Sequence, residues 1–419
     1  MDFEDSPEEA AFRVEARAWL EKNAKRREKS GRGLGLFEEP GDETKMVQDA
    51  KAWQARKADG GWACLTWPTG YGGRGGTPIQ SVIWGQEESK FEVPPNIFAI
   101  GIGMAGPTIM THGTEEQKQK YLKPMARGDE IWCQLFSEPG AGSDLAALRT
   151  KAERQGDDWI VNGQKVWTSG AHYSRYGILV TRTDFTAHKH KGLTYFIVDM
   201  KSPGIEIRPI KQMTGGANFN EVFFTDVRIP DANRLDEVGK GWQVAITTLM
   251  NERMTIGGGG MGAGFGLADL MGYVSSCTAY DGHSAIEDSH VRQRLADLIC
   301  RLRGLELTGN RLVTALSQGK MPGPEGSIMK LAMGILLQEL GAFGMDISCA
   351  NGALYGEDAP LRALWQSIYL GSPAIRIAGG ADEVQRNIIS ERVLGLPTEI
   401  RVDKSVPFSE VPTGPRAAA

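Results

Sequence analysis

The fold is decided by Cys133-Gln134-Leu135-Phe136-Ser137-Glu138-Pro139-Gly140-Ala141-Gly142-Ser143-Asp144 and by Asn162-Gly163-Gln164-Lys165-Val166-Trp167-Thr168-Ser169-Gly170. The first stretch predicts a buried strand that runs into a glycine turn capped by Ser143 and Asp144. The second contains Asn-Gly, the strongest short hairpin signal, and predicts a hairpin ending at Trp167 and Ser169. Glycine lets a backbone approach a ligand closely, while hydroxyls and an indole supply donors and a flat apolar wall. The two stretches therefore predict a ligand site, with a turn-rich hairpin that binds nothing as the alternative.

These paired stretches closely resemble the flavin-binding signature of the acyl-CoA dehydrogenases. The resemblance covers nearly the whole chain, as far as Arg386-Asn387-Ile388-Ile389-Ser390-Glu391-Arg392, an ending typical of the family. It implies FAD as the cofactor, with Phe136 and Ser137 lining the flavin, Ser169 bonding its redox edge and Trp167 flanking the ring. The cofactor-binding residues that the resemblance implies are Gln134, Phe136, Ser137, Trp167, Ser169, Asn351, Gly352 and Glu383.

Composition limits the remaining function classes. A net charge of −5 argues against a nucleic-acid or anionic-membrane surface. The chain has no uninterrupted apolar stretch long enough to span a bilayer, and its acidic start is unlike a signal sequence. The five scattered cysteines predict buried free thiols in a reducing compartment, and hence a cytoplasmic protein. His188-Lys189-His190 is expected to be an exposed loop, so no metal site is predicted.

The 419 residues should form two or three packed units. Helical spacing predicts a helical domain over residues 1–128, beginning at the Ser6-Pro7 capping signal. Short β-type runs predict a β-barrel or sandwich over 129–238, and helical spacing resumes over 239–396. Residues 397–419 show no period and should be a flexible tail. The fold class is α+β, with a ligand cleft between domains and, by the resemblance, a C-terminal four-helix bundle.

Desaturating an acyl thioester needs a carboxylate for the α-proton, donors for the thioester oxygen and a hydride acceptor. Many family members carry the carboxylate in a Tyr-Glu-Gly-Thr stretch, but here the matching residues are Ala378-Gly379-Gly380-Ala381. A minority, isovaleryl-CoA dehydrogenase among them, place the base directly before an Arg on the first long helix of the C-terminal domain. That place holds Asn251-Glu252-Arg253-Met254.

The resemblance therefore implies Glu252 as the catalytic base, with a solvated helical Glu-Arg pair as the alternative. The backbone N–H of Gly379, together with a flavin ribityl hydroxyl, would hold the thioester oxygen. Ser143 and Arg253 are the implied substrate-binding residues, with Arg253 packed beneath the site to fix the helix.

Glycines crowd the residues after Glu252 at positions 257, 258, 259, 260, 262, 264 and 266. Each interior glycine costs a helix about 0.5–1 kcal/mol relative to Ala, so something must offset the run. Either a neighbouring helix packs very closely, or space is left for a ligand. We favour space for a branched or ring-bearing acyl group, such as a steroid-derived thioester, and Gly379 would widen the same pocket.

The flavin-phosphate end departs from the family pattern. Tyr280–Ala285 contains no Arg where one is usually lent to a neighbour's flavin, and Ala381 stands where a Thr is usual. The resemblance implies a homo- or hetero-oligomer, a dimer or tetramer. A related second chain would supply the Arg, or Arg292 or Arg294 would substitute for it. The expected electron acceptor is an electron-transfer flavoprotein, and the competing function is a non-catalytic partner subunit.

Overall fold

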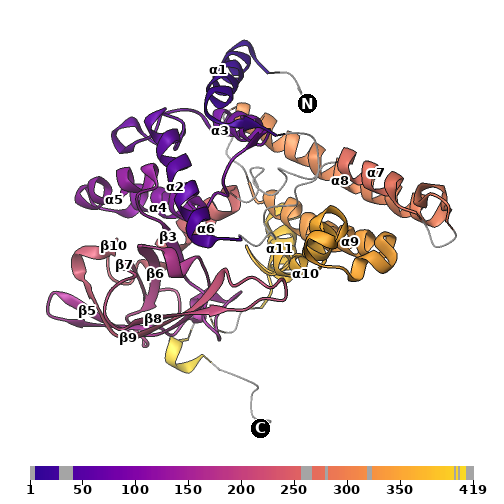
Figure 1. Cartoon of the computed structure of the whole chain (residues 1–419). Coiled ribbons are helices and arrows are strands. Elements are labelled where there is room, and N and C mark those ends of the chain that lie inside the picture. Colours follow the sequence, from indigo (N-terminus) through magenta and orange to yellow (C-terminus); the bar gives the residue numbers. More distant parts are fainter. Residues whose placement is uncertain are drawn as a thin grey trace, which may run out of the picture.

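The structure is a computed structural model that describes residues 5–27, 41–255, 267–278, 282–318, 323–400, 403 and 406–411. Figure 1 shows the N-terminal helices above a β domain, with the C-terminal helices beside both. This order of helices, strands and helices confirms the predicted α+β class. The predictions at the glycine run 257–266 and at residues 280–281 lie outside the described residues.

The N-terminal region is helical, as predicted. Ser6 accepts from the Glu9 N–H and the Glu9 carboxylate accepts from the Ser6 N–H, so a complete capping box starts the first helix one residue before Pro7. Phe12 and Leu20 of this helix are buried in the N-terminal core. The helices are α1 (Pro7–Asn23), α2 (Glu43–Asp59), α3 (Pro78–Glu88), α4 (Gly106–His112) and α5 (Glu115–Arg127).

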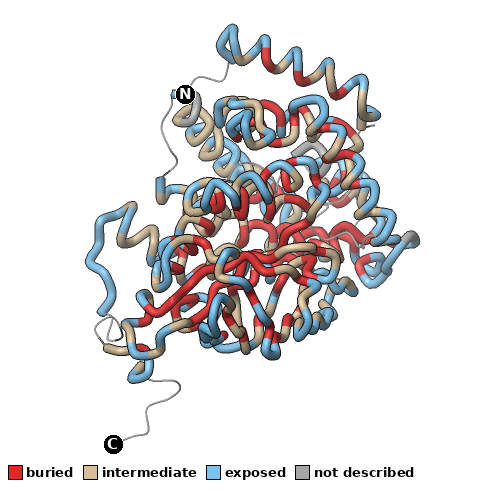
Figure 2. Tube along the Cα trace, turned by 90° about the vertical axis from the view of Figure 1, so that its left-hand side faces the viewer, coloured by how far each residue is buried: buried red, intermediate tan, exposed pale blue. Residues whose placement is uncertain are grey.

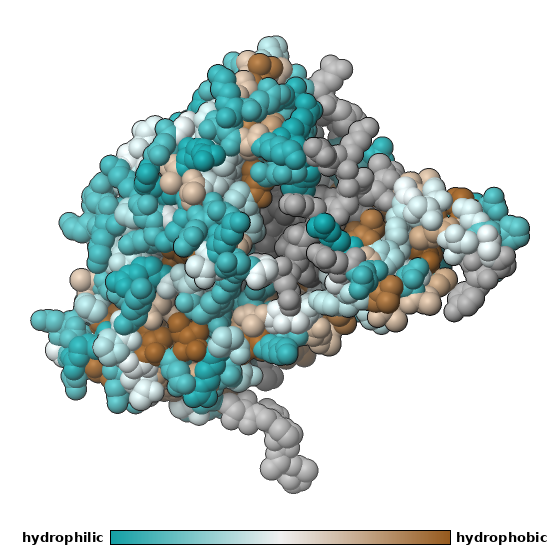
Figure 3. Space-filling view, in the orientation of Figure 1, coloured by the Kyte–Doolittle hydropathy of each residue, from teal (hydrophilic) through white to brown (hydrophobic). Residues whose placement is uncertain are grey.

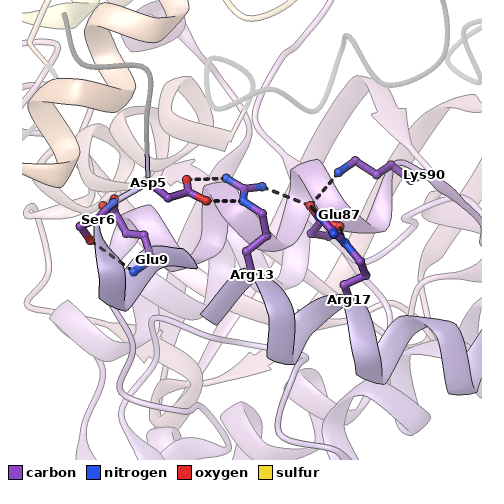
Figure 4. Close-up of polar contacts among 7 residues, drawn as sticks. All are labelled: Asp5, Ser6, Glu9, Arg13, Arg17, Glu87 and Lys90. Atoms are coloured by element: carbon purple, nitrogen blue, oxygen red, sulfur yellow. Dashed lines mark hydrogen bonds and ion pairs between the residues drawn. The ribbon is translucent and has the colours of Figure 1, made fainter. Parts of the chain in front are cut away.

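One buried carboxylate fastens α1 to α3 (Figure 4). The Glu87 side chain is fully buried and accepts from Arg13 at 3.2 Å, Arg17 at 2.9 Å and Lys90 at 2.7 Å. Burial alone would raise the pKa of the Glu87 carboxyl, but these three hydrogen bonds lower that pKa to about 2. The helix pair is therefore fixed by charge as well as by apolar packing.

The middle region forms one sheet in the order β10-β7-β6-β4-β5-β9-β8, and β3 pairs in parallel with β6. The β-type runs of the sequence at 178–181, 193–198, 205–208 and 222–224 all lie in strands. The strands are β3 (Trp132–Leu135), β4 (Lys151–Gln155), β5 (Asp158–Ser169), β6 (Tyr176–Arg182), β7 (Leu193–Asp199), β8 (Ile205–Ile210), β9 (Phe219–Pro230) and β10 (Arg234–Leu235).

The predicted hairpin turn at Asn162-Gly163 is wrong. These residues lie inside β5 at a register shift against β9, and the turn that joins β4 to β5 is Gly156-Asp157. Asn162 instead exchanges two hydrogen bonds with Asp226 on β9. A Cβ on Gly163 would lie 2.7 Å from the Thr150 Cα, so glycine is needed for close approach rather than for a turn.

Two apolar cores organise the first two regions. One lies within the sheet, and the other joins N-terminal helices, strands and α6 (Gly241–Thr255). Figure 2 shows the buried residues running continuously through the strands and the helices that cover them. The thiols of Cys64 and Cys133 are buried, but Cys300 and Cys349 are exposed, so the prediction of buried thiols is wrong for those two.

The predicted C-terminal four-helix bundle is confirmed: one apolar cluster draws its residues from four successive helices. They are α7 (Leu267–Ser276), α8 (Ser289–Ser317), α9 (Gly326–Ser348) and α10 (Leu364–Ile375), followed by α11 (Asp382–Ile388). The stretch Gly326–Ala353 is long and apolar enough to cross a membrane by length and composition. Its Leu336, Leu340 and Phe343 pack in the bundle core, which accounts for that hydropathy.

The tail is not wholly flexible, contrary to the prediction for 397–419. Residues 406–411 lie against the β domain, with a 3₁₀ turn at Phe408–Glu410. Phe408 is 2% exposed, so an aromatic anchor in an aperiodic segment fixes this part of the chain.

Candidate active site

The two motif stretches meet in space. The Val166 N–H donates to the Ser137 carbonyl at 2.9 Å, which places Phe136 and Ser137 beside the strand that carries Trp167 and Ser169. The Phe136 ring is buried and meets Tyr195 edge-on, with centroids 5.9 Å apart. The structure therefore brings together four of the predicted cofactor-binding residues.

A buried ion pair beneath them was missed by the sequence analysis. The Lys165 ammonium is fully buried and donates to the Phe136 carbonyl at 3.0 Å and to the Glu138 carboxylate at 2.8 Å. Glu138 also accepts from the N–H groups of Arg149 and Thr150. Burial alone would raise the pKa of Glu138, but the charge and hydrogen bond of Lys165 and these further bonds hold it below its usual value. A charged residue thus fixes the backbone at Phe136.

Trp167 has a rare backbone conformation for a residue with a side chain. Its φ is +61°, at a register shift between Lys165 and Thr168 where β5 pairs with β9. Its indole is 57% exposed and stands edge-on to Phe219. Strained backbone persists where the surroundings fix it, often at binding sites. An accessible indole two residues before Ser169, on the strand that bonds to Ser137, fits a role beside the flat ring of FAD.

The helix that carries Glu252 is tied to both other regions. Thr248, one turn before Glu252, is fully buried and hydrogen-bonds to Thr108 on α4 and to Tyr195 on β7, each at 2.9 Å. Residues one turn apart share a helix face, so Glu252 lies on the side of α6 that is anchored. Glu252 is half-buried. The side chain of Arg253 lies outside the described residues.

A second polar connection holds the same helix. His112 at the end of α4 lies 2.9 Å from the Asp236 carboxylate and 2.9 Å from the Thr247 hydroxyl. Because Thr247 is on α6 and Asp236 follows β10, one imidazole links all three parts of the chain. Together, His112 and Thr248 fix the position of α6, the helix that carries the predicted base.

Gly379 lies in the turn between α10 and α11. Its φ is +67°, a left-handed conformation that favours glycine. The Gln385 amide donates to the carbonyls of Gly379 at 3.0 Å and Gly380 at 3.3 Å, and Lys330 also donates to Gly380. Residue 379 therefore contributes backbone rather than a carboxylate, as its predicted role as a donor of N–H requires.

The remaining candidates lie at the edges of these elements. Gln134 is half-buried in β3, and Ser143 is exposed in the turn that follows. Asn351 and Gly352 lie in the 3₁₀ helix Cys349–Ala353 that follows α9, where the Gln366 amide donates to both carbonyls. Glu383 is exposed in the first turn of α11. The structure places Asn351, Gly352 and Glu383 on the C-terminal helices rather than in the β-domain cluster.

Arg294 lies on α8 and contacts α9. It donates to Asp346 near the end of α9 at 2.7 Å, and it lines a groove of about 460 Å³ between α8 and α9 with Arg301 and Phe343. Arg292 instead donates to the carbonyls of Ile286 and Glu287. Of these two arginines, Arg294 therefore contacts α9, the helix that precedes Asn351, and Arg292 bonds to the segment just before its own helix.

Three family models match in succession: the acyl-CoA dehydrogenase N-terminal domain over residues 6–129, the middle domain over 133–227 and the C-terminal domain over 239–394. Acyl-CoA dehydrogenase IpdE1 of Mycobacterium tuberculosis is 37% identical, over 93% of this chain and 98% of that protein. Acyl-CoA dehydrogenase FadE34 of the same organism is 39% identical, over 82% of this chain and 46% of that protein.

Two solved structures share the fold over nearly the full chain. The "Tcur3481-Tcur3483 steroid ACAD" superposes with a TM-score of 0.77 at 27% identity, covering 95% of this chain and 100% of that one. The ChsE4-ChsE5 complex of Mycobacterium tuberculosis gives a TM-score of 0.75 at 28% identity, with the same coverage.

Proposed function

The chain belongs to the acyl-CoA dehydrogenase family of FAD-dependent oxidoreductases, and from that premise we propose that Glu252 is the base that desaturates an acyl-CoA thioester. FAD, when bound, supplies the acceptor for the β-hydrogen and its electron pair. The α C–H bond breaks, its proton passes to the Glu252 carboxylate, and its electron pair forms the new double bond. The Gly379 N–H holds the thioester oxygen, where negative charge develops.

The observation that carries this proposal is the anchoring of α6. Thr248 and Thr247 connect the helix of Glu252 to residues of the other two regions. One of these residues, Tyr195, contacts Phe136, which is predicted to line the flavin. At the alternative position for a base, residue 379 offers only backbone. A base must be held within reach of its proton, so a fixed helix next to the predicted cofactor-binding residues supports Glu252 as the base.

The test is Glu252→Gln in the FAD-loaded protein. An amide cannot accept the proton, so turnover with an acyl-CoA and a dye acceptor should fall by roughly three orders of magnitude or more. Flavin content and acyl-CoA binding should stay unchanged. Glu287→Gln, an exposed carboxylate in a 3₁₀ turn of the C-terminal region, is the matched control. Near-normal turnover of the Glu252→Gln variant would show that the base is elsewhere. No turnover by the wild type with any acyl-CoA would favour the partner-subunit function.

The proposed substrate is a thioester with a branched or ring-bearing acyl group. Support comes from the glycines after Glu252, from Gly379 in place of a larger residue, and from the similar fold of the Tcur3481-Tcur3483 steroid ACAD. A panel of polycyclic, branched and linear acyl-CoA thioesters tests this. A clear preference for butyryl- or octanoyl-CoA would contradict it, although a single methylene changes discrimination by only ~1–3 kcal/mol.

The proposed assembly pairs this chain with a related second chain and passes electrons to an electron-transfer flavoprotein. Figure 3 shows apolar residues among the hydrophilic ones on the C-terminal helices, where Leu307, Ile328 and Tyr369 are exposed. Such residues are common in oligomer interfaces. A homo-oligomer with full flavin content and activity would contradict the heteromer. Failure to reduce an electron-transfer flavoprotein, with normal dye reduction, would contradict the acceptor.

A further inference from the structure

The C-terminal segment 406–411 is built into the β domain next to the turn that carries Ser143. The Phe408 N–H donates to the Ala187 carbonyl and the Ser409 N–H to the Phe185 carbonyl, both at 2.9 Å. Pro407 pairs with His188 in an antiparallel bridge. The segment is therefore bonded through its backbone to the loop between β6 and β7.

Arg182, at the end of β6, connects this segment to the turn. Its guanidinium is buried and donates to the carbonyls of Leu148 at 3.0 Å, Ala146 at 2.6 Å and Lys189 at 3.2 Å. The Phe408 ring covers the guanidinium at 3.4 Å from its carbon to the ring centroid. A buried cation loses hydration, and the three carbonyls and the aromatic face compensate for that loss. Without Phe408, the guanidinium would be open to water, and its hydrogen bonds to the carbonyls of residues 146 and 148 would weaken.

A second link runs through Lys189. Its ammonium is nearly buried and donates to both Asp144 carboxylate oxygens, at 3.0 and 3.1 Å, and to the carboxylate of Asp403. Asp144 directly follows Ser143. The tail thus supplies one carboxylate to the cation that fixes the residue next to the predicted substrate contact.

We propose that Phe408 and Asp403 are positioning residues that hold the Ser143 turn, residues 142–148, in the conformation that receives the acyl-CoA. The inference rests on the proposed function, and the substrate role of Ser143 is the one that the family resemblance implies. Residues 142–144 are exposed and belong to no strand, so their order depends on these contacts. A turn that must be ordered on binding lowers affinity, whereas chemistry at Glu252 is unaffected. The effect should therefore appear in KM rather than in kcat.

The experiment compares Phe408→Ala and Asp403→Asn with the control Glu410→Ala, an exposed residue of the same 3₁₀ turn. All are tested in the full-length, FAD-loaded protein with its partner chain if one is needed. Amide hydrogen exchange is followed over residues 142–148 and 184–191, and KM and kcat are measured with an acyl-CoA. Asp403→Asn removes a charge and not a core ring, so it remains informative if Phe408→Ala fails to fold.

We expect about tenfold faster exchange at 142–148 and about tenfold higher KM, with kcat and flavin content within twofold of wild type. The control should behave as wild type. Unchanged exchange would show that Phe408 and Asp403 do not order the Ser143 turn. Faster exchange with unchanged KM would show that the order of this turn does not affect substrate binding. If the wild type neither bound nor oxidised any acyl-CoA, the proposed function would fail, and the exchange data would still decide whether the tail orders the turn.

Discussion

The two ends of the candidate cofactor site are built differently. In the β domain, Phe136 directly follows β3 and Trp167 lies on β5, and the buried Lys165–Glu138 pair fixes the backbone at Phe136. On the C-terminal helices, Asn351 and Glu383 lie at exposed helix ends. The first end is completed by this chain's own packing. The second end presents its side chains to solvent, as expected for residues that contact another molecule.

Because of this difference, substitutions at the two ends of the candidate cofactor site should have different effects. Phe136, Lys165 and Trp167 each have a conformation or partner that only the folded chain provides, so substitution should change flavin binding and, at the buried Lys165, stability as well. Asn351 and Glu383 contribute little to folding, so their effect should depend on what the chain assembles with. The size of the stability change on substitution should therefore separate the two ends.

The largest effect is expected from Lys165→Met. The substitution leaves the Glu138 carboxylate buried without its cation and frees the Phe136 carbonyl, which should cost about 3–5 kcal/mol in the free energy of unfolding and most of the bound flavin. Chemical denaturation and the flavin-to-protein ratio measure this. Lys151→Met, at an exposed ion pair in the same sheet, is the control and should change stability by less than about 1 kcal/mol. Equal losses in the two variants would show that the buried pair is not special.

Acid should weaken the N-terminal anchor in a defined range. The pKa of Glu87 is about 2, below the usual 4.5, so its contribution to stability is complete above pH 4.5 and is lost as the pH falls toward 2. The shift corresponds to roughly 2–3 kcal/mol, allowing for the partial exposure of Arg17. Unfolding at a series of pH values should show this loss in the wild type and much less of it in Glu87→Gln. Parallel pH curves for the two proteins would refute the assignment.

A smaller and opposite-signed effect is expected at Trp167. Glycine adopts a φ of +61° without strain, so Trp167→Gly should leave stability unchanged or raise it by about 1 kcal/mol. It should also weaken flavin binding by about tenfold, because the flat wall beside the ring is lost. Trp167→Phe keeps a ring and should retain more flavin. Thermal unfolding and flavin titration are the measurements, and a loss of stability in the glycine variant would mean that the indole is structural.

Much of the fold and part of the site could be predicted from the sequence, and the misses have physical causes. Capping at Ser6 and the apolar period of residues 12–20 are local signals, so the first helix was predicted correctly. Asn162-Gly163 was misread as a turn because its glycine serves close approach to Thr150, a contact between residues distant in the sequence. The docking of Phe408 was missed for the same reason, since a single anchor in an aperiodic segment leaves no pattern.

Lys165 could have been found. Trp159 and Val161 are the inward positions of β5, and Lys165 falls on the same alternation, which directs a cation into the core. Its partner Glu138 lies in the other motif, at a distance that no local rule supplies. Glu252 could be nominated only through resemblance, because nothing local distinguishes it from a solvated helical Glu. Its support comes from the tertiary contacts of Thr248.

The smallest stability effect is expected at the C-terminal end, from Asn351→Ala. The Asn351 side chain is exposed and the Gln366 amide bonds its backbone carbonyl, which alanine keeps, so unfolding should change by less than about 0.5 kcal/mol. If this end serves a neighbouring subunit, the variant should fold as wild type alone yet lower the flavin content of the assembled oligomer. Gln366→Ala is the contrasting variant, because it frees three buried or half-buried carbonyls and should destabilise the isolated chain. Full flavin content in an oligomer of Asn351→Ala would remove this end from the cofactor site and leave the β domain as its main determinant.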